Sequence, residues 1–408
     1  MIKYTTYRNS VSLHYGNSLM NLYLLPSEGG RIIQLSMGEY EYLYNNSDNS
    51  ENNTGWKNRG GEKIWPAPQG WNGADQWPGP INSILDSGKY DLSEVSNDKY
   101  GEGIRLTSPY DEFTGIISSR EIFLSQSSAV INISARFKNN SDTPRTWSIW
   151  PVCQVDTLQN EVLEEGRFTF YCPTNRNSKF PDGYKIMHGV VNNPQYRIGK
   201  TGNFTAAYNY MVGKVGLDSN GGWAASLDKK YGKVLCLSFD VVPGAIYPHD
   251  TSVQFWTSGV GVVYSGNRLK NHPDNKNQNP PYGEIEILSP LHKLKPGESA
   301  FFDYKISICT IPAGEEIYSI STIAVTAREL SAQITNKKTI IKGKYGHFYN
   351  GYITVEANGD ILLKQEVSPY SGSEISIITD QIISGKISVM AYDKENLFLG
   401  LIDKININ

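Results

Sequence analysis

The chain has 408 residues, of which 39% are hydrophobic and 19% are charged. These values are typical of a globular protein with a sizeable core, and the length allows two or three domains. The 41 acidic residues against 38 basic ones give a formal net charge of −3, without long runs of one sign. That balance argues against a nucleic-acid partner, because binding to a phosphate backbone requires a concentrated basic face.

No targeting or metal-binding pattern is present in the sequence. The first residues, Met1 to Arg8, lack the charged and then apolar plan of a secretory signal. No apolar run approaches the roughly 18 residues of a membrane span. We therefore expect a soluble, cytoplasmic protein without a membrane partner. The four cysteines are widely spaced and show no zinc-type Cys/His pattern, so we expect neither a metal nor another cofactor.

Short β-strand patterns dominate the chain and are separated by turn clusters rich in Gly, Pro, Asn and Asp. In the clearest of them, every second residue from Ile131 to Phe137 is apolar, as in a half-buried antiparallel strand. The strands predicted in the first three quarters of the chain are 18–25, 31–35, 118–124, 130–137, 147–155, 234–239, 252–257, 283–288 and 300–309.

The predicted fold class is all-β. The strands of residues 1–315 are too many for a simple immunoglobulin-like sandwich, so we expect one large antiparallel domain of two wide packed sheets. Helical periodicity is confined to Ser319 to Ile334, where we expect a linker with one short helix and place the domain boundary. Further strand patterns up to residue 392 predict that residues 316–408 end in a small β-sandwich.

The segment from Gly60 to Pro80 is rich in tryptophan, glycine and proline. With Trp56 just before it, it contains four of the eight tryptophans of the chain. Gly and Pro favour fixed loops over helices or central strands. One interpretation is that some indoles, Trp65 and Trp71 among them, line a groove for a ligand with apolar faces and polar edges, such as a sugar. The other is that Pro–Trp contacts hold a long loop against the domain; both can apply to different rings.

The strand at residues 283–288 carries the best catalytic candidates. Period two places Ile285 and Ile287 on one face and Glu284 and Glu286 on the other. If the isoleucines enter the core, the two carboxylates project together, roughly 6–7 Å apart. Like charges that close separate their pKa values, which can produce a catalytic acid or base near neutral pH. The alternative is an ordinary pair of glutamates on a solvated sheet face.

Histidine is the residue type we expect to supply the complementary acid. His249 is followed by Asp250, a carboxylate that could hold the protonated ring. His188 follows a loop that could fold over a groove. Either residue could equally be an ordinary surface or structural histidine.

Four more residues are candidates for binding a ligand. Arg31 and Lys63 could bind sugar hydroxyls or an acidic group, and the amide of Gln154 could bind a diol beside Trp150. An arginine after two glycines is also a common strand-edge charge. Lys63 lies within the Trp/Pro/Gly segment, which favours the functional interpretation.

Three segments together resemble a bacterial protein family related to galactose mutarotase, an aldose 1-epimerase. They are the Gly-Gly-Arg-Ile run within residues 25–35, the Trp/Pro segment at 60–71, and the glutamate strand with its following Leu-Lys-Pro-Gly-Glu turn at 284–299. The resemblance spans roughly residues 15–310 and implies a β-supersandwich with a sugar-binding groove across one sheet. It implies that Glu286 or Glu284 takes the proton of the anomeric hydroxyl. The family's histidine, which protonates the ring oxygen, has no counterpart in Ile149 to Gln154, where it is expected.

From these patterns we expect a carbohydrate-binding protein whose groove takes a mono- or oligosaccharide. If it is an enzyme, it performs acid/base chemistry at the anomeric carbon or an adjacent one. Two alternative hypotheses remain open at this stage: a sugar-binding or regulatory module without turnover, and a lyase or hydrolase component of polysaccharide breakdown.

Overall fold

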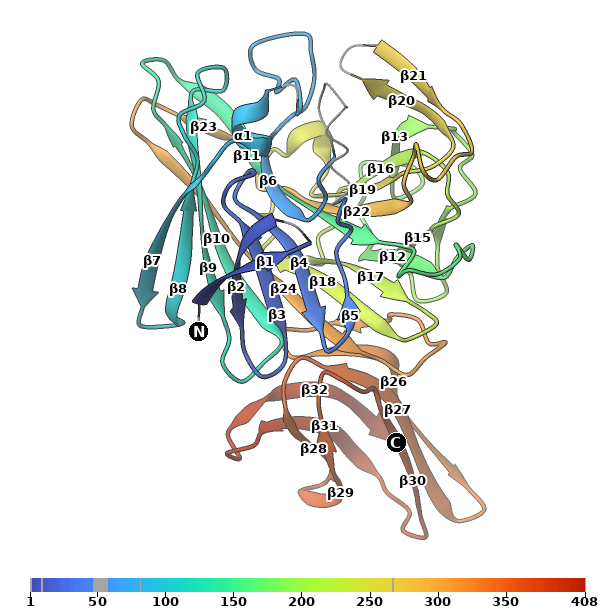
Figure 1. Ribbon diagram of the computed structural model, residues 1–408. Coiled ribbons are helices and arrows are strands. Elements are labelled where there is room, and N and C mark those ends of the chain that lie inside the picture. Colours follow the sequence, from blue (N-terminus) through green and yellow to red (C-terminus); the bar gives the residue numbers. More distant parts are fainter. Residues whose placement is uncertain (1, 9, 47–57, 81, 266–267, 408) are drawn as a thin grey trace. The chain divides into compact units, whose positions relative to one another are not determined.

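The computed structural model describes residues 2–8, 10–46, 58–80, 82–265 and 268–407, and its regular structure is almost entirely β-strand (Figure 1). Within these ranges the helices are α1 (Ser83–Ser87) and the 3-10 helix η1 (Pro248–Asp250). The side chain of Asn82 caps α1 by accepting a hydrogen bond from the backbone N–H of Ile84. The all-β fold class predicted from the sequence is confirmed.

The larger sheet has 12 strands in the spatial order β1-β2-β3-β4-β6-β11-β22-β19-β16-β13, with β5 paired to β4 and β23 paired to β11. The bounds of these strands are β1 Ile2–Tyr7, β2 Ser10–Gly16, β3 Asn21–Leu25, β4 Arg31–Met37, β5 Tyr40–Glu41, β6 Glu62–Ala67, β11 Arg145–Asp156, β13 Lys185–Gly189, β16 Gly213–Leu217, β19 Val253–Thr257, β22 Tyr282–Ile287 and β23 His292–Leu294. The neighbours β6, β11 and β22 come from distant parts of the chain. Segments that are far apart in sequence therefore meet in the middle of this sheet.

A second sheet has 10 strands in the order β14-β15-β12-β17-β18-β24-β10-β9-β8-β7, and β20 and β21 form a separate hairpin. The bounds are β7 Asp91–Asn97, β8 Gly101–Thr107, β9 Ile116–Leu124, β10 Val130–Asn139, β12 Phe168–Pro173, β14 Tyr196–Ile198, β15 Asn203–Ala207, β17 Trp223–Asp228, β18 Lys233–Phe239, β20 Gly261–Ser265, β21 Arg268–His272 and β24 Ser299–Thr310. Strand 130–137, predicted from its alternation, corresponds to β10.

The chain divides into two compact units, of which the first comprises Met1–Ser125, Ile131–Ser226 and Leu237–Ile306. The larger sheet and most of the second sheet lie in this unit and pack against each other there. The ring of Phe255 on β19 lies 5.8 Å from Phe170 and 6.0 Å from Phe204, both of the second sheet. Gly283 on β22 faces Phe170 so closely that an added Cβ would lie 2.2 Å from the ring. The unit is the large antiparallel sandwich that the strand patterns predict.

A buried ion pair links the two sheets beneath the middle of the larger one. Glu62 on β6 is fully buried; one of its carboxylate oxygens accepts a bond from the Arg120 guanidinium on β9. The other oxygen accepts a hydrogen bond of 2.6 Å from the Tyr304 hydroxyl on β24. Because successive residues of a strand point to opposite faces, Lys63 next to Glu62 projects from the outer face of the sheet.

The second unit comprises Gln126–Val130, Leu227–Cys236 and Ser307–Asn408. Its C-terminal part contains two four-stranded sheets, β25-β26-β27-β30 and β29-β28-β31-β32. The bounds are β25 Ser319–Ile320, β26 Ala324–Thr335, β27 Lys338–His347, β28 Gly351–Ala357, β29 Asp360–Val367, β30 Ser373–Thr379, β31 Gly385–Asp393 and β32 Phe398–Ile407. Residues of both sheets, such as Ile341, Tyr345, Ile353 and Val389, form one buried cluster.

The short helix expected at Ser319 to Ile334 is wrong, because this segment forms β25 and most of β26. Its pairing with β27 has register shifts between Thr326 and Arg328 and again between Arg328 and Ser331. Each extra residue in such an irregularity changes which side of the strand faces the core. Buried apolar residues then recur at intervals of three, as at Ala324, Ala327 and Leu330, which imitates helical spacing.

Candidate functional site

Polar and aromatic side chains gather on the outer face of the larger sheet, across β6, β11, β22, β19 and β16. Residues directly opposite each other in an antiparallel pair lie on the same face. The pairs Trp65–Trp150, Lys63–Val152, Val152–Glu286, Gln154–Glu284, Glu284–Trp256 and Trp256–Lys214 connect these strands in turn. We call this set of side chains the polar cluster: Lys63, Trp65, Trp150, Gln154, Lys214, Trp256, Glu284 and Glu286.

The two glutamates of β22 lie on this face while Ile285 and Ile287 are buried in the sandwich, as the alternation predicts. The face is not solvated, however, since Glu284 is only 8% exposed and Glu286 is 0% exposed. The alternative of two glutamates on a solvated sheet face is therefore wrong. A buried carboxylate must be stabilised by hydrogen bonds or an opposite charge. Different residues provide this stabilisation for Glu284 and for Glu286.

Glu284 accepts a hydrogen bond of 2.5 Å from the side-chain amide of Gln154. Burial, followed by the negative charge of Glu286, raises the pKa of Glu284 to about 7, against the opposing effect of Lys63. Both the protonated and the ionised form are thus accessible near neutral pH. A carboxyl group in this state can serve as an acid or as a base.

Glu286 is anchored through one of its two oxygens. Its Oε2 accepts hydrogen bonds of 2.9 Å from the Trp150 indole N–H and of 2.9 Å from the Lys214 ammonium. Its Oε1 is buried and has no hydrogen-bond partner among the residues that the structure describes. The side chain of Lys214 is partly exposed and also lies 4.7 Å from the centroid of the Trp150 ring, so the ion pair has one side open toward solvent.

Lys63 is buried beside these carboxylates. Its Nζ lies 4.2 Å from the centroid of the Trp65 ring and makes no hydrogen bond to any described residue. Burial lowers the pKa of Lys63 to about 8; the nearby Arg31 also lowers it, while Asp86, Glu284 and Glu286 raise it. The side-chain oxygen of Gln154 is likewise buried without a partner in the described part of the chain.

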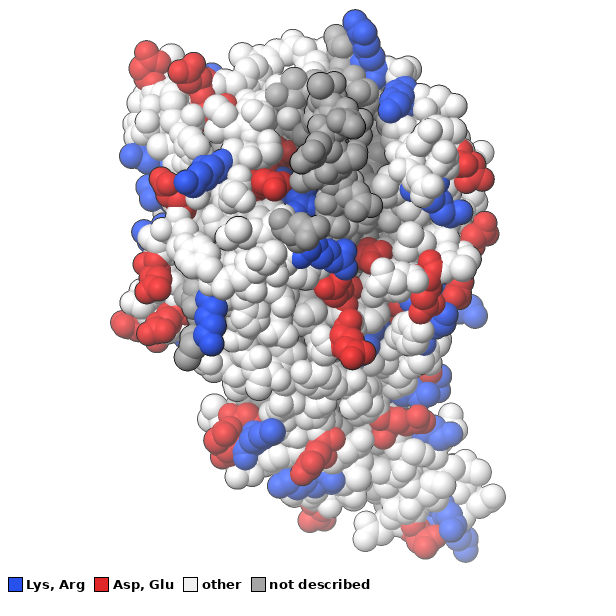
Figure 2. Space-filling model, viewed as in Figure 1, with Lys and Arg blue, Asp and Glu red and all other residues white. Residues whose placement is uncertain are grey.

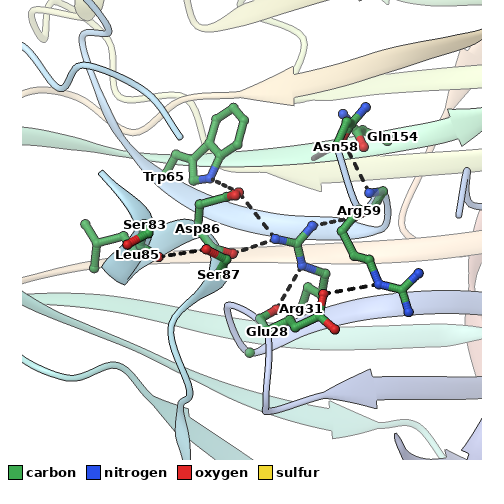
Figure 3. A network of polar contacts seen from close by, with 12 residues as sticks. Glu28, Arg31, Asn58, Arg59, Trp65, Ser83, Leu85, Asp86, Ser87 and Gln154 are labelled. Atoms are coloured by element: carbon green, nitrogen blue, oxygen red, sulfur yellow. Dashed lines mark hydrogen bonds and ion pairs between the residues drawn. The ribbon is translucent and has the colours of Figure 1, made fainter. Parts of the chain in front are cut away.

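Arg31 uses its guanidinium within the protein. It donates to the backbone carbonyls of Glu28 at 2.9 Å, Gly60 at 2.8 Å and Asp86 at 2.5 Å, and it forms an ion pair of 3.3 Å with the Asp86 carboxylate (Figure 3). The same carboxylate accepts a hydrogen bond of 3.1 Å from the Trp65 indole N–H. Arg31, expected to bind the ligand, is therefore placed to fix Trp65 through Asp86.

Trp65 and Trp77 form part of a buried aromatic wall. The Trp65 ring lies 5.0 Å from Trp77 and 5.6 Å from Trp150, and all three are buried. For Trp77 the interpretation as a loop anchor holds. Trp71 is different, because it remains 37% exposed on the loop that follows β6. Trp56 lies outside the described residues.

The two histidine candidates are at the border of this face. His188 on β13 is opposite Lys214, and its Nε2 lies 2.5 Å from the carbonyl oxygen of Val262. The pKa of His249 is lowered, first by burial and then by the positive charges of Lys214 and Lys185. Asp250, expected to stabilise protonated His249, instead forms an ion pair with Lys179. Asp250 raises the pKa of His249 less than burial and the nearby lysines lower it, so the protonated ring is not favoured.

Sequence reasoning did not select Lys214 or Trp256. Both lie on short strands without an unusual motif, and only the pairing of β16 with β19 and of β19 with β22 brings them to Glu284 and Glu286. Among the described residues no cluster of His, Cys, Asp or Glu could hold a metal ion, and no described helix is long and apolar enough to cross a membrane. On the face in Figure 2, acidic and basic side chains are interspersed.

No family model matches the chain, and no curated protein is similar enough in sequence to match it. Several solved structures match its fold. The Slr1438 protein of Synechocystis is 14% identical, with 76% of this chain and 99% of that chain covered and a TM-score of 0.45. A galactose mutarotase-like protein of Lactobacillus casei is 11% identical, with 73% and 99% covered and a TM-score of 0.45.

A galactose mutarotase-like protein of Clostridium acetobutylicum is also 11% identical, with 76% of this chain and 98% of that chain covered and a TM-score of 0.45. Two of these structures are thus described as galactose mutarotase-like, which is the family that the sequence resembles. Likenesses at these identities concern the fold alone and carry no information about ligand or activity.

Proposed function

We propose that the polar cluster binds a sugar and that Glu284 acts as an acid/base group at its anomeric carbon. One observation supports this most: Lys63 Nζ, Gln154 Oε1 and Glu286 Oε1 are buried on one face, and none has a hydrogen-bond partner among the described residues. Buried polar groups are nearly always hydrogen-bonded. A ligand with several hydroxyl groups could donate to the two oxygens and accept from the amine.

The character of the cluster favours a sugar over an ionic ligand. The two carboxylates disfavour an anion, and the two lysines disfavour a cation. The rings of Trp65 and Trp150 lie beside these groups, and a sugar combines hydroxyl edges with apolar ring faces. The partly exposed side chains of Lys214 and Trp256 mark the side from which such a ligand would enter.

The proposed reaction opens and recloses the sugar ring. The Glu284 carboxylate removes the proton of the anomeric hydroxyl, and the electrons of that O–H bond form the carbonyl at C1. The bond between C1 and the ring oxygen breaks, its electron pair stays on the ring oxygen, and this oxygen takes a proton from the Lys63 ammonium. Reclosure on the other face of the carbonyl by the reverse steps gives the other anomer.

The decisive experiment measures anomer interconversion in Glu284→Gln. The amide retains the shape and the hydrogen bond from Gln154 but cannot take the proton, so the enzyme-dependent rate should fall by about 10²–10⁴. Polarimetry or NMR with freshly dissolved α-glucose and α-galactose provides the rate. Glu94→Gln, an exposed change on β7, is the matched control. A variant with the full wild-type rate would contradict the role of Glu284.

A second candidate is sugar binding without turnover. It is favoured by the hydrogen bonds that already occupy one oxygen of each glutamate, from Gln154 to Glu284 and from Lys214 to Glu286. In that case tryptophan fluorescence should report sugar binding by the wild type and by Glu284→Gln alike, while neither accelerates anomer interconversion.

A further inference from the structure

A row of aromatic rings continues from the polar cluster into solvent. The ring of His188 stacks on Trp256 at 5.9 Å with an interplanar angle of 24°. Tyr264 on β20 lies 5.2 Å from His188, and Trp71 lies 5.5 Å from Tyr264. We call these four residues, Trp71, His188, Tyr264 and Trp256, the aromatic shelf.

The outer end of the aromatic shelf combines exposure with a fixed geometry. Trp71 is 37% exposed and Tyr264 is 55% exposed. The Trp71 indole N–H nevertheless donates a hydrogen bond of 3.0 Å to the Pro78 carbonyl. Its loop is closed by backbone hydrogen bonds of 2.9 Å from Gly70 to Trp77 and from Trp77 to Pro68, with the Trp77 ring fully buried. A held but exposed ring loses little conformational freedom when a ligand covers it.

The inner end of the aromatic shelf belongs to the polar cluster itself. Trp256 is directly opposite Glu284 on one side and Lys214 on the other. His188 is opposite Lys214 on the next strand. The shelf is therefore continuous with the proposed sugar site and leads outward from its partly exposed side.

We propose that the aromatic shelf binds the further residues of an oligosaccharide whose terminal sugar occupies the polar cluster. This inference rests on the proposed function and extends it from a single sugar to a short chain of sugars. Sugar residues offer apolar ring faces that can cover exposed aromatic rings, while their hydroxyl edges stay in water.

The test compares mono- and trisaccharide binding by isothermal titration calorimetry. The probes are glucose, galactose, mannose and xylose and their β-1,4-linked trisaccharides. For the wild type we expect at least one trisaccharide to bind about tenfold more tightly than its monosaccharide. Trp71→Ala should remove this advantage and leave monosaccharide affinity unchanged, and Trp71→Phe should restore part of it.

Phe113→Ala is the matched control, because Phe113, between β8 and β9, is a similarly exposed aromatic residue (43%) that is not part of the aromatic shelf. A melting curve for each variant verifies folding. Equal affinities of the wild type for mono- and trisaccharide would overturn the role of the shelf while leaving the proposed function intact. So would an unchanged trisaccharide affinity in Trp71→Ala. Absence of binding by every mono- and trisaccharide would contradict the proposed function itself.

Discussion

At the residue scale, two neighbouring glutamates of one strand have different hydrogen-bond partners. Glu286 accepts hydrogen bonds from a lysine and an indole N–H, whereas Glu284, among the described residues, accepts one from the amide of Gln154 and lies near the charge of Glu286. A neutral donor compensates a buried carboxylate less than an ammonium does. Burial and the charge of Glu286 raise the pKa of Glu284 to about 7.

The first prediction concerns the pH dependence of catalysis. Glu284 must be ionised to take a proton, and Lys63 must be protonated to give one. The rate of anomer interconversion should therefore rise as the pH passes about 7 and fall as it passes about 8, which are the pKa values of Glu284 and Lys63. Lys63→Arg keeps the positive charge but holds its proton, so its slower reaction should lack the alkaline fall. A wild-type rate independent of pH between 5 and 10 would speak against this pair of roles.

The second prediction concerns stability. Because the pKa of Glu284 is raised to about 7 in the folded protein, the fold favours the protonated form, and ionisation lowers the free energy of unfolding as the pH rises from about 4.5 to 7. Glu284→Gln has no ionisable group at this position, so its free energy of unfolding does not decrease in this way. Above pH 7 it should be more stable than the wild type by about 1–3 kcal/mol, and below pH 4 the two should be equal. Urea denaturation across this pH range measures the difference; equal stabilities throughout would show that the carboxylate is not destabilised.

At the element scale, the position of β22, which carries both glutamates, depends on how closely the two sheets pack against each other. Gly283 makes this approach possible, since a Cβ there would lie 2.2 Å from the Phe170 ring. Interiors are packed densely enough that such a clash must move the strand or the ring.

The third prediction follows from this contact. Gly283→Ala should lower the free energy of unfolding by about 1–3 kcal/mol and weaken sugar binding through displacement of Glu284. Combining it with Phe170→Leu, which removes part of the ring, should cost less than the sum of the two single changes. Denaturant unfolding of the four proteins completes the cycle. Strict additivity would show that Gly283 and Phe170 do not compete for the same space.

At the scale of the whole molecule, the C-terminal part has a core of its own. The buried cluster that includes Ile341, Ile353 and Val389 is formed entirely by residues beyond 329. Both four-stranded sheets are likewise formed by strands within residues 319–407. We therefore propose that residues 316–408 form a separate domain.

The fourth prediction tests this boundary. A fragment of residues 316–408 should have a β-type circular dichroism spectrum and unfold cooperatively on heating, because it is within the size range that folds alone. Ile353→Ala, which deletes a fully buried side chain, should lower its stability by about 2–5 kcal/mol. A fragment without a cooperative transition would place the boundary elsewhere.

The local sequence pattern was enough to predict the all-β fold class and the direction of several side chains. Period-two alternation was sufficient for the strand character of elements such as β10 and for the common face of Glu284 and Glu286, because successive residues of a strand point to opposite sides. Assigning the Gly/Pro-rich tryptophan segment to loop was wrong for Glu62–Ala67, which form the central strand β6, and right for the residues that follow up to Pro80. Alternation failed at residues 319–334, where irregular pairing with β27 changes the phase of the strand.

Only the tertiary structure determined which side chains are in contact and how their pKa values are shifted. Lys214 and Trp256 join the glutamates through strand pairings between distant segments, and the guanidinium of Arg31 is taken by carbonyls from three separate parts of the chain. Burial and partners set a pKa, and both depend on these long-range contacts. The order of residues along one strand therefore fixes the direction of a side chain, whereas its chemistry is set by the strands that become its neighbours.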